Sequence, residues 1–330
     1  MLRVKMAGLG WYLPERRVTN VELEKRLGIP AGWIERATGV MERRYVSACE
    51  SAVSMGAAAA YMALRHAGLE VNDIDAIIGA SSAPHQAIPC TAALLQRELG
   101  APEGASACFD INATCLSFLF ALQTAAHLVT ANVYRSVLIC STEVASRSLN
   151  PRERESAVLF GDGAAAAIIT ASQAGEESAF YHAFFETHSS GADLTEITGG
   201  GTHHHPNDPG TTPEMNMFHM QGPAIFRQAA LLMEPFLDRF FAASGWERRQ
   251  IDAVIPHQAS RHAIEQLSRR FGFSSDQLIL NLALRGNCVS ASIPLALAEA
   301  VYDGRIRRGD RILLVGTGAG LTLGAAALIF

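Results

Sequence analysis

The chain has 330 residues, of which 49% are hydrophobic and 18% charged, and its formal net charge is −5. This length can bury a large core, as one domain or as two of about 150 residues each. The acidic balance and the presence of only two lysines argue against nucleic-acid binding, and the interruption of every long apolar run by Gly, Thr or charges argues against a membrane span.

The first half of the chain alternates apolar, strand-like runs with helical patterns. Strands are predicted at 4–10, 74–80, 106–111, 136–141 and 164–170. Helices are predicted at 20–27, with Asn20 as N-cap, at 51–67, at 91–99, and from Leu116 to about Val129. The polar, aromatic segment 33–39 reads as a connection that could hold a planar ligand group.

The second half repeats this order. Ile-Asp-Ala-Ile-Ile at 74–78 returns as Ile-Asp-Ala-Val-Ile at 251–255, and the helical run 93–102 is matched by 263–274. The strand 136–141 corresponds to 311–316, and a Gly-rich hairpin at 161–170 to a second one at 316–330. This self-similarity predicts two copies of a βαβαβαββ unit, at 1–172 and 221–330, with a site where two helix N-termini converge.

The segment 173–220 between the halves differs in character and is predicted to be a loop-rich connection. It contains Gly199 to Gly201, three histidines at 203–205, and several prolines up to Pro213. Neighbouring histidines on an extended chain point to opposite faces, so no metal site is expected there. We expect residues 199–213 to form a mobile surface loop that covers a site entrance.

Cys115 is the candidate nucleophile. It lies in a polar turn at the start of an apolar helix, where free backbone N–H groups and the helix dipole would favour the thiolate. A cysteine between small and apolar residues can also be simple packing. The six cysteines show no CxxC spacing, which favours reduced thiols over disulfides or a zinc site.

Two distant segments favour the catalytic interpretation of Cys115. One contains His257 after a proline, and the other contains Asn287 after a glycine. Each alone is an ordinary turn residue, but a cysteine far upstream of a histidine and an asparagine is the arrangement of a nucleophilic cysteine enzyme.

Five ordered motifs now give a recognisable pattern. They are Asp-Ile-Asn-Ala-Thr-Cys at 110–115, Phe-Gly-Asp-Gly-Ala at 160–164, Pro-His-Gln-Ala at 256–259, Gly-Asn-Cys-Val-Ser-Ala-Ser-Ile-Pro at 286–294, and the C-terminal Gly-rich hairpin. In order and spacing the chain resembles β-ketoacyl-ACP synthase III over essentially its full length. The resemblance implies a thiolase-like α/β fold with a five-layered α-β-α-β-α core, a homodimer, and a Cys115–His257–Asn287 triad.

The resemblance also implies a reaction and its partners. An acyl-CoA primer acylates Cys115, and the acyl group condenses with malonyl-ACP (acyl carrier protein) under decarboxylation. Acyl-CoA is then a substrate, and no cofactor or metal is expected. The backbone N–H groups of Cys115 and Ala319 would form the oxyanion hole, although the family usually has glycine at the second position. Alanine tolerates a positive φ less readily than glycine.

Further residues match the family's CoA-binding and acyl-binding positions. Trp33 matches an aromatic that stacks on adenine, Arg154 an adenine-facing arginine, and Arg36 lies one position from the usual phosphate-binding arginine. Ile88 replaces a Phe of short-primer members, and we expect it to reach the partner's acyl tunnel and to allow a primer longer than acetyl.

The triad also suits other chemistry, namely non-decarboxylative joining of two acyl-CoAs or acyl transfer to an alcohol or amine. Glu143 could be a base for such a reaction, but a strand-end surface role is favoured. The mean hydropathy of +0.14 favours a homo-oligomer, and the absence of a recognisable secretory signal favours the cytoplasm.

Overall fold

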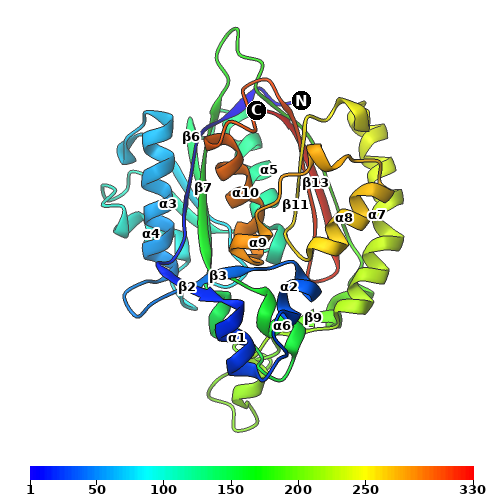
Figure 1. The fold of residues 1–330 in the computed structure, drawn as a ribbon. Coiled ribbons are helices and arrows are strands. Elements are labelled where there is room, and N and C mark those ends of the chain that lie inside the picture. Colours follow the sequence, from blue (N-terminus) through cyan, green and yellow to red (C-terminus); the bar gives the residue numbers. More distant parts are fainter.

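Two sheets with the same strand topology form the framework of the protein (Figure 1). The structure is a computed structural model, and it describes residues 1–330 apart from the side chains of Glu155 and Leu267. The first sheet has the order β1-β7-β6-β4-β5, and the second has the order β11-β12-β13-β8. Their strands are β1 (Val4–Tyr12), β4 (Ala76–Gly79), β5 (Ala107–Asp110), β6 (Ser136–Glu143), β7 (Gly163–Ala171), β8 (Ala179–Thr187), β11 (Ala253–Pro256), β12 (Arg311–Gly318) and β13 (Thr322–Ile329).

The pairing directions match position by position. In the first sheet β4 runs parallel to β5 and β6, and β7 runs antiparallel to β6 and β1. In the second sheet β11 runs parallel to β12, and β13 runs antiparallel to β12 and β8. The position that β5 occupies in the first sheet is taken in the second by a single parallel bridge between Val254 and Leu278. The predicted internal repeat is therefore confirmed.

Helices form three layers around the two sheets (Figure 1). The first sheet is covered on its outer face by α3 (Ala52–Ala67) and α4 (Thr91–Glu98). The second sheet is covered by α7 (Gly222–Ser244) and α8 (Arg261–Arg270). Between the sheets lie α5 (Ser117–Thr130) and α10 (Ser292–Tyr302), which contact strands of both. The expected five-layered α-β-α-β-α core is confirmed.

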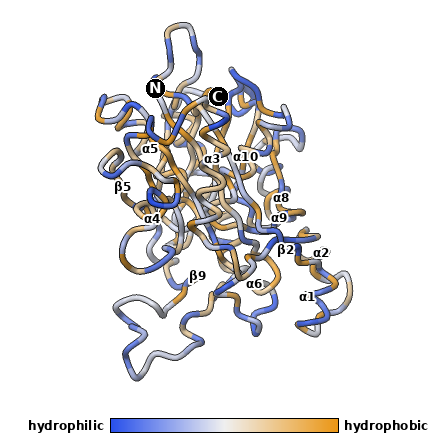
Figure 2. Tube along the Cα trace, turned by 90° about the vertical axis from the view of Figure 1, so that its left-hand side faces the viewer, coloured by the Kyte–Doolittle hydropathy of each residue, from blue (hydrophilic) through white to orange (hydrophobic). Residues whose placement is uncertain are grey.

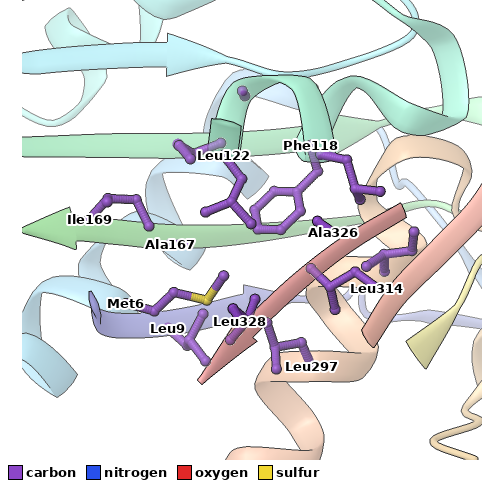
Figure 3. Packing of buried hydrophobic residues seen from close by; sticks show 14 of the residues in the cluster. Met6, Leu9, Phe118, Leu122, Ala167, Ile169, Leu297, Leu314, Ala326 and Leu328 are labelled. Atoms are coloured by element: carbon purple, nitrogen blue, oxygen red, sulfur yellow. The ribbon is translucent and has the colours of Figure 1, made fainter. Parts of the chain in front are cut away.

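The central layer is the most deeply buried part of the molecule. Figure 3 shows Phe118 and Leu122 of α5 packed among strand residues such as Ile169 and Leu314. Every residue from 292 to 300 of α10 is buried. A helix that is apolar on all sides can be stable only in such a position, which explains the lack of a polar face in its sequence.

The outer helix α3 packs unusually close to β1. A Cβ atom added to Gly8 would lie 2.1 Å from the carbonyl oxygen of Ala63, and one added to Gly10 would lie 2.2 Å from that of Ala59. Glycine is therefore required at both strand positions, because any side chain there would collide with the backbone of α3.

Several local predictions were wrong. The segment 33–39 is not a connection but contains the helix α2 (Trp33–Thr38), flanked by Gly32 and Gly39 with positive φ. The helix α1 (Asn20–Leu27) is capped by Thr19, whose hydroxyl accepts a hydrogen bond from the Glu22 N–H, and not by Asn20. The side-chain amide of Asn20 instead donates to the carbonyl of Val40 at 2.8 Å.

Other differences concern strands. The short strands β2 (Arg16–Thr19) and β3 (Glu42–Tyr45) form a separate ribbon that was not predicted. Residues 161–170 do not form a hairpin, because β7 pairs with β6 and β1, whereas β12 and β13 do form one. The segment 173–220 is not all connection, since β8 lies in it and joins the second sheet.

The part of segment 173–220 that follows β8 lies outside the five layers. The strands β9 (Thr195–Glu196) and β10 (His219–Met220) pair with each other, and the chain between them forms a long, mostly exposed loop that extends below β9 in Figure 2. Two short helices, α6 (Arg154–Leu159) and α9 (Leu282–Arg285), complete the fold. None of the helices in the described residues has the length and apolar character that a membrane span requires.

Candidate functional site

The two central helices begin in the same way. A turn of 3-10 helix, Thr114–Leu116, precedes α5, and an equivalent turn, Val289–Ala291, precedes α10. In the first, the Asn112 side-chain oxygen accepts a hydrogen bond from the Thr114 N–H at 2.9 Å. In the second, the Asn287 side-chain oxygen accepts one from the Val289 N–H at 2.8 Å. The two turns are equivalent in the internal repeat, and they contact each other.

Both turns are strained at the same position. Thr114 has a φ of 52° and Val289 a φ of 48°, so two β-branched residues occupy the left-handed region. Such residues are rare there, and each costs on the order of 1 to 3 kcal/mol. Strain of this kind persists where a functional arrangement needs it, and these two positions therefore mark the convergence of the two turns as the candidate site.

The two asparagines differ in what their amide groups do. The amide of Asn112 donates to the carbonyl of Ser82 at 2.9 Å. The Asn287 oxygen additionally accepts from the Ser292 hydroxyl at 3.3 Å, while no described residue accepts from its amide N–H. The side-chain oxygen of Asn287 is thus held by hydrogen bonds within the protein, and its amide N–H can donate to a ligand.

Cys115 lies in the turn before α5 and is partly exposed. The backbone N–H groups of Ala319 and of Cys115 itself interact with its sulfur and lower its pKa. Burial, together with the nearby carboxylate of Glu143, outweighs them and raises the pKa of the Cys115 thiol to about 12. Desolvation of the sulfur therefore opposes the thiolate that the position at the helix start favours.

The backbone conformation of the turn accommodates alanine at position 319, where the family usually has glycine. Ala319 does not adopt a positive φ; the following residue, Gly320, does, with a φ of 128°. The turn between β12 and β13 therefore places its left-handed conformation on the glycine and leaves Ala319 unstrained.

His257 follows β11 and is buried, with 7% of its surface exposed. Its backbone N–H donates to the carbonyl of Val315 in β12 at 2.8 Å. Burial lowers the pKa of the imidazole to about 4, so the ring is neutral at pH 7 and carries one N–H. Its Nδ1 atom is buried without a hydrogen-bond partner among the described residues.

Glycines in β12 let these groups approach one another. A Cβ atom on Gly316 would lie 2.6 Å from the Cβ of His257 and 3.4 Å from the Cδ2 of Leu116, and one on Gly318 would lie 2.8 Å from the Thr114 hydroxyl. The segment of His257 and the turn of Cys115 therefore meet at the same end of β12. The turn of Asn287 joins them through its contact with the Cys115 turn.

Glu143 is not the surface residue that the sequence suggested. It ends β6 and has only 2% of its surface exposed. Its carboxylate accepts hydrogen bonds from the backbone N–H and the hydroxyl of Ser82, both at 2.6 Å, and from the hydroxyl of Ser290. Burial raises its pKa to about 7. The sequence alone offered no signal for the Ser82 and Ser290 contacts, because the three residues are far apart in the chain.

The residues matched to CoA binding lie on neighbouring helices. Trp33 and Arg36 belong to α2, which contacts α6, and Arg154 is the first residue of α6. The backbone carbonyl of Arg36 accepts a hydrogen bond from Nε2 of His262 in α8 at 2.9 Å. Ile88, with 84% of its surface exposed, lies apart from these helices in the loop before α4. CoA binding and the acyl-tunnel role stay predictions.

A cavity of about 420 Å³ connects this region with His257. Its walls include Thr38 of α2, Leu159 of α6, Met220 of β10, and His257. Met220 follows the long loop of residues 199–213, so the base of that loop lies at the cavity while its middle is exposed. The role of the loop as an entrance cover stays a prediction. The described residues contain no cluster of three or more metal-ligating side chains.

The buried carboxyl of Glu143 makes stability depend on pH. Its folded-state pKa of about 7 lies above the ordinary value of 4.5, so the stabilisation it provides is complete below pH 4.5 and is lost as the pH rises through 7. We expect the free energy of unfolding of the wild type, relative to Glu143→Gln, to fall by up to about 3 kcal/mol between pH 4.5 and 8. Urea denaturation at a series of pH values measures this difference.

Glu143→Asp is the matched control for that experiment, because it keeps a titratable carboxyl at the same place and should retain part of the pH dependence. A difference between wild type and Glu143→Gln that does not change with pH would show that the buried carboxyl does not titrate as described.

Comparison with known proteins finds matches over the two segments that contain the turns of Cys115 and Asn287. The family model described as 3-oxoacyl-[acyl-carrier-protein (ACP)] synthase III matches residues 109–189, and the model of its C-terminal part matches residues 241–330. The chain is 36% identical to β-ketoacyl-[acyl-carrier-protein] synthase III of Bartonella bacilliformis, covering 99% of both chains. It is 37% identical to the Acidiphilium cryptum protein of the same name, covering 100% of both.

Solved structures agree with this result. The 3-oxoacyl-[acyl-carrier-protein] synthase III of Aquifex aeolicus superposes with a TM-score of 0.89 at 33% identity, covering 99% of this chain and 100% of the other. The priming β-ketosynthase of the R1128 polyketide pathway gives 0.91 at 29% identity, covering 99% and 96%. Full-length identity above 30%, the matching family models and the shared topology together show that the chain belongs to the β-ketoacyl-ACP synthase III family of condensing enzymes.

Proposed function

We propose that this enzyme is an acyltransferase that accepts an acyl group from acyl-CoA on Cys115 and condenses it with malonyl-ACP, releasing carbon dioxide and initiating a fatty-acid or related chain. The observation that carries the proposal is the meeting of the Cys115 turn, the Asn287 turn and His257 at one end of β12. The names of the relatives, which are synthases of β-ketoacyl-ACP, support it.

In the first half-reaction, the sulfur of Cys115 attacks the thioester carbonyl of acyl-CoA. A new carbon–sulfur bond forms while the carbonyl oxygen becomes negative. We assign the stabilisation of this oxygen to the N–H groups of Cys115 and Ala319, and their interaction with the Cys115 sulfur supports the assignment. The bond to CoA then breaks, and the thiol proton of Cys115 goes to the leaving CoA sulfur.

In the second half-reaction, the malonyl thioester loses carbon dioxide, and the electron pair of the broken bond becomes an enolate. The α-carbon of the enolate attacks the carbonyl carbon of acyl-Cys115. A carbon–carbon bond forms, the carbon–sulfur bond to Cys115 breaks, and the sulfur takes up a proton to return to the thiol.

His257 and Asn287 suit the role of stabilising that enolate. The imidazole is neutral and can donate through Nε2, and the Asn287 amide N–H has no protein acceptor among the described residues. Two donors aimed at the oxygen where charge develops each contribute a factor of about 10² to 10³.

The alternatives, joining of two acyl-CoAs without decarboxylation or transfer to an alcohol or amine, call for a base at the site. Glu143 is the nearby carboxylate, but its oxygens are occupied by Ser82 and Ser290, which favours the decarboxylating reaction. Incubation with acyl-CoAs of two to twelve carbons and either malonyl-ACP or a second acyl-CoA tests this, with mass spectrometry of Cys115 and of the product.

We further propose that the enzyme acts as a cytoplasmic homodimer with acyl-CoA as a substrate and without a cofactor. The free cysteines suit a reducing compartment. The high exposure of Ile88 suits a residue that reaches the acyl tunnel of a second subunit.

Variants of the three site residues should separate the two half-reactions. Cys115→Ser should not be acylated by acyl-CoA. His257→Ala and Asn287→Ala should each still be acylated but release carbon dioxide from malonyl-ACP about 10² to 10³ times more slowly, because each removes one enolate donor. Intact-protein mass spectrometry and radiolabelled carbon dioxide measure the two steps. His127→Ala, an exposed position on α5, is the control.

Full condensing activity of Cys115→Ser would disprove the mechanism. Equal loss of acylation and decarboxylation in His257→Ala would contradict the assignment of His257 to the second step.

The turn between β12 and β13 generates a further prediction. Gly320→Ala places a side chain at a φ of 128° and 3.2 Å from the Thr322 hydroxyl, so the turn must shift and move the Ala319 N–H. We expect acylation of Cys115 to slow by about 10²-fold. Ala319→Gly is the matched control and should stay within about threefold of wild type, because Ala319 is not strained. Stopped-flow or quenched-flow acylation measures both. A stronger effect from Ala319→Gly than from Gly320→Ala would contradict this account of the turn.

A further inference from the structure

Gln258, which follows the histidine of the site in the chain, is completely buried. Its side chain makes all four hydrogen bonds of which a carboxamide is capable. The Nε2 group donates to the carbonyls of Pro256 at 2.8 Å and Ile279 at 3.3 Å. The Oε1 atom accepts from the backbone N–H groups of Asn281 and Leu282, both at 3.2 Å. Gln258 therefore joins two separate stretches of backbone.

These hydrogen bonds take the place of a missing strand. In the first sheet β4 pairs with β5 along its whole length. In the second sheet only the bridge between Val254 and Leu278 occupies that position. The backbone after Leu278 has no neighbouring strand, and buried backbone groups need hydrogen-bond partners. The side chain of Gln258 supplies them, which explains why a large polar residue is buried here.

The stretch that Gln258 holds is the start of α9, which lies below α10 in Figure 1 and leads directly to the turn of Asn287. Glu299 of α10 holds the same helix at both ends. Its carboxylate accepts a hydrogen bond from the Asn281 side-chain amide at 2.9 Å and pairs with the Arg285 guanidinium at 2.8 Å. The helix α9 is therefore a fixed connection between Gln258 and the Asn287 turn.

The two proposed enolate donors differ in how they are held. The backbone N–H of Asn287 donates to the carbonyl of Leu159 at 2.9 Å, and its carbonyl accepts from the Gly161 N–H at 3.0 Å. The backbone of His257 is bonded to β12, but the Nδ1 atom of its ring has no partner among the described residues. The imidazole thus keeps its place through the adjoining backbone, which Gln258 bonds. Loss of these bonds should displace the imidazole while Asn287 stays in place.

We propose that Gln258 is a positioning residue for decarboxylation: its carboxamide holds the imidazole of His257 at the distance from Asn287 at which both side chains can donate to one enolate oxygen. This inference rests on the proposed function. It concerns the second half-reaction only, because none of the described hydrogen bonds of Gln258 reaches the turn of Cys115.

Gln258→Met tests the proposal, because methionine has a similar length but cannot make these hydrogen bonds. We expect release of carbon dioxide from malonyl-ACP to fall by at least about 10-fold, up to the loss seen in His257→Ala, because a displaced donor gives up most of its effect. Acylation of Cys115 by acyl-CoA should stay within about threefold of wild type. Radiolabelled carbon dioxide and intact-protein mass spectrometry measure the two rates.

A double-mutant cycle separates positioning from general damage. In the His257→Ala background, Gln258→Met should change the release of carbon dioxide by less than about twofold, because the side chain that Gln258 positions is already absent. A variant that merely damages the fold would reduce the rate by the same factor in both backgrounds.

Gln277→Met is the matched control. The Gln277 side chain also bonds backbone, accepting from the Ser274 N–H at 2.9 Å and donating to the Ile251 carbonyl at 2.6 Å, but it does so at the end of β11 opposite to His257. Both half-reactions should stay within about twofold of wild type. Gln258→Glu, which lacks the full set of donors, serves if Gln258→Met does not fold, and the same selective loss is expected.

Three results would overturn the proposal. They are an unchanged release of carbon dioxide in Gln258→Met, an equal loss of acylation and decarboxylation, and a loss that is as large in the His257→Ala background as in the wild type.

A second arm does not depend on turnover. It follows the His257 ring by NMR, with its signal identified as the one missing in His257→Ala. Burial lowers the pKa of this imidazole to about 4. In Gln258→Met we expect the pKa to rise toward the ordinary value of 6.5, because a displaced ring gains contact with water, whereas Gln277→Met should leave it unchanged.

An unchanged His257 pKa in Gln258→Met would also overturn the proposal. If the wild type releases no carbon dioxide from malonyl-ACP, the proposed function has failed, while the NMR titration still decides whether Gln258 positions His257.

Discussion

The strained start of the two central helices is the constraint on which the rest of the site depends. Thr114 and Val289 are held in the left-handed region by the side chains of Asn112 and Asn287, which accept the hydrogen bonds of their N–H groups. Neither helix could relax without giving up these bonds and the packing of the buried layer behind them. The packing of the two buried helices therefore fixes the positions of the turns that carry Cys115 and Asn287.

From this common start the two repeats diverge. The position of Cys115 in the first turn is taken in the second by Ser290, whose hydroxyl is bonded to Glu143. The amide of Asn112 is bonded within the protein, whereas that of Asn287 is free of described acceptors. One half thus supplies the nucleophile and the other a donor. Glu143 links the two halves, because its carboxylate accepts hydrogen bonds from Ser82 of the first half and from Ser290 of the second.

The sequence was most informative where pattern determines structure. The alternation of elements, the internal repeat and the positions of Cys115, His257 and Asn287 could be read from periodicity and motif spacing. Features that depend on contacts between residues distant in the chain could not be predicted from it. The burial of Glu143 depends on Ser82 and Ser290, the β8 strand has meaning only beside β13, and the Cys115 pKa follows from desolvation that no local pattern reveals. The helix α2 was missed because its glycine-flanked single turn and a half resembles a loop in composition.

The alternation of side chains along β12 has a consequence for how this enzyme could change. Gly316 and Gly318 face the centre, and Val315 faces the outer helices. A slip of one residue against β13 would exchange the two sets and fill the centre with branched side chains. The register of β12 against β13 is therefore fixed by the reacting groups that lie beside it. New substrate preferences must arise from the side chains around the site, which can vary in size without shifting β12.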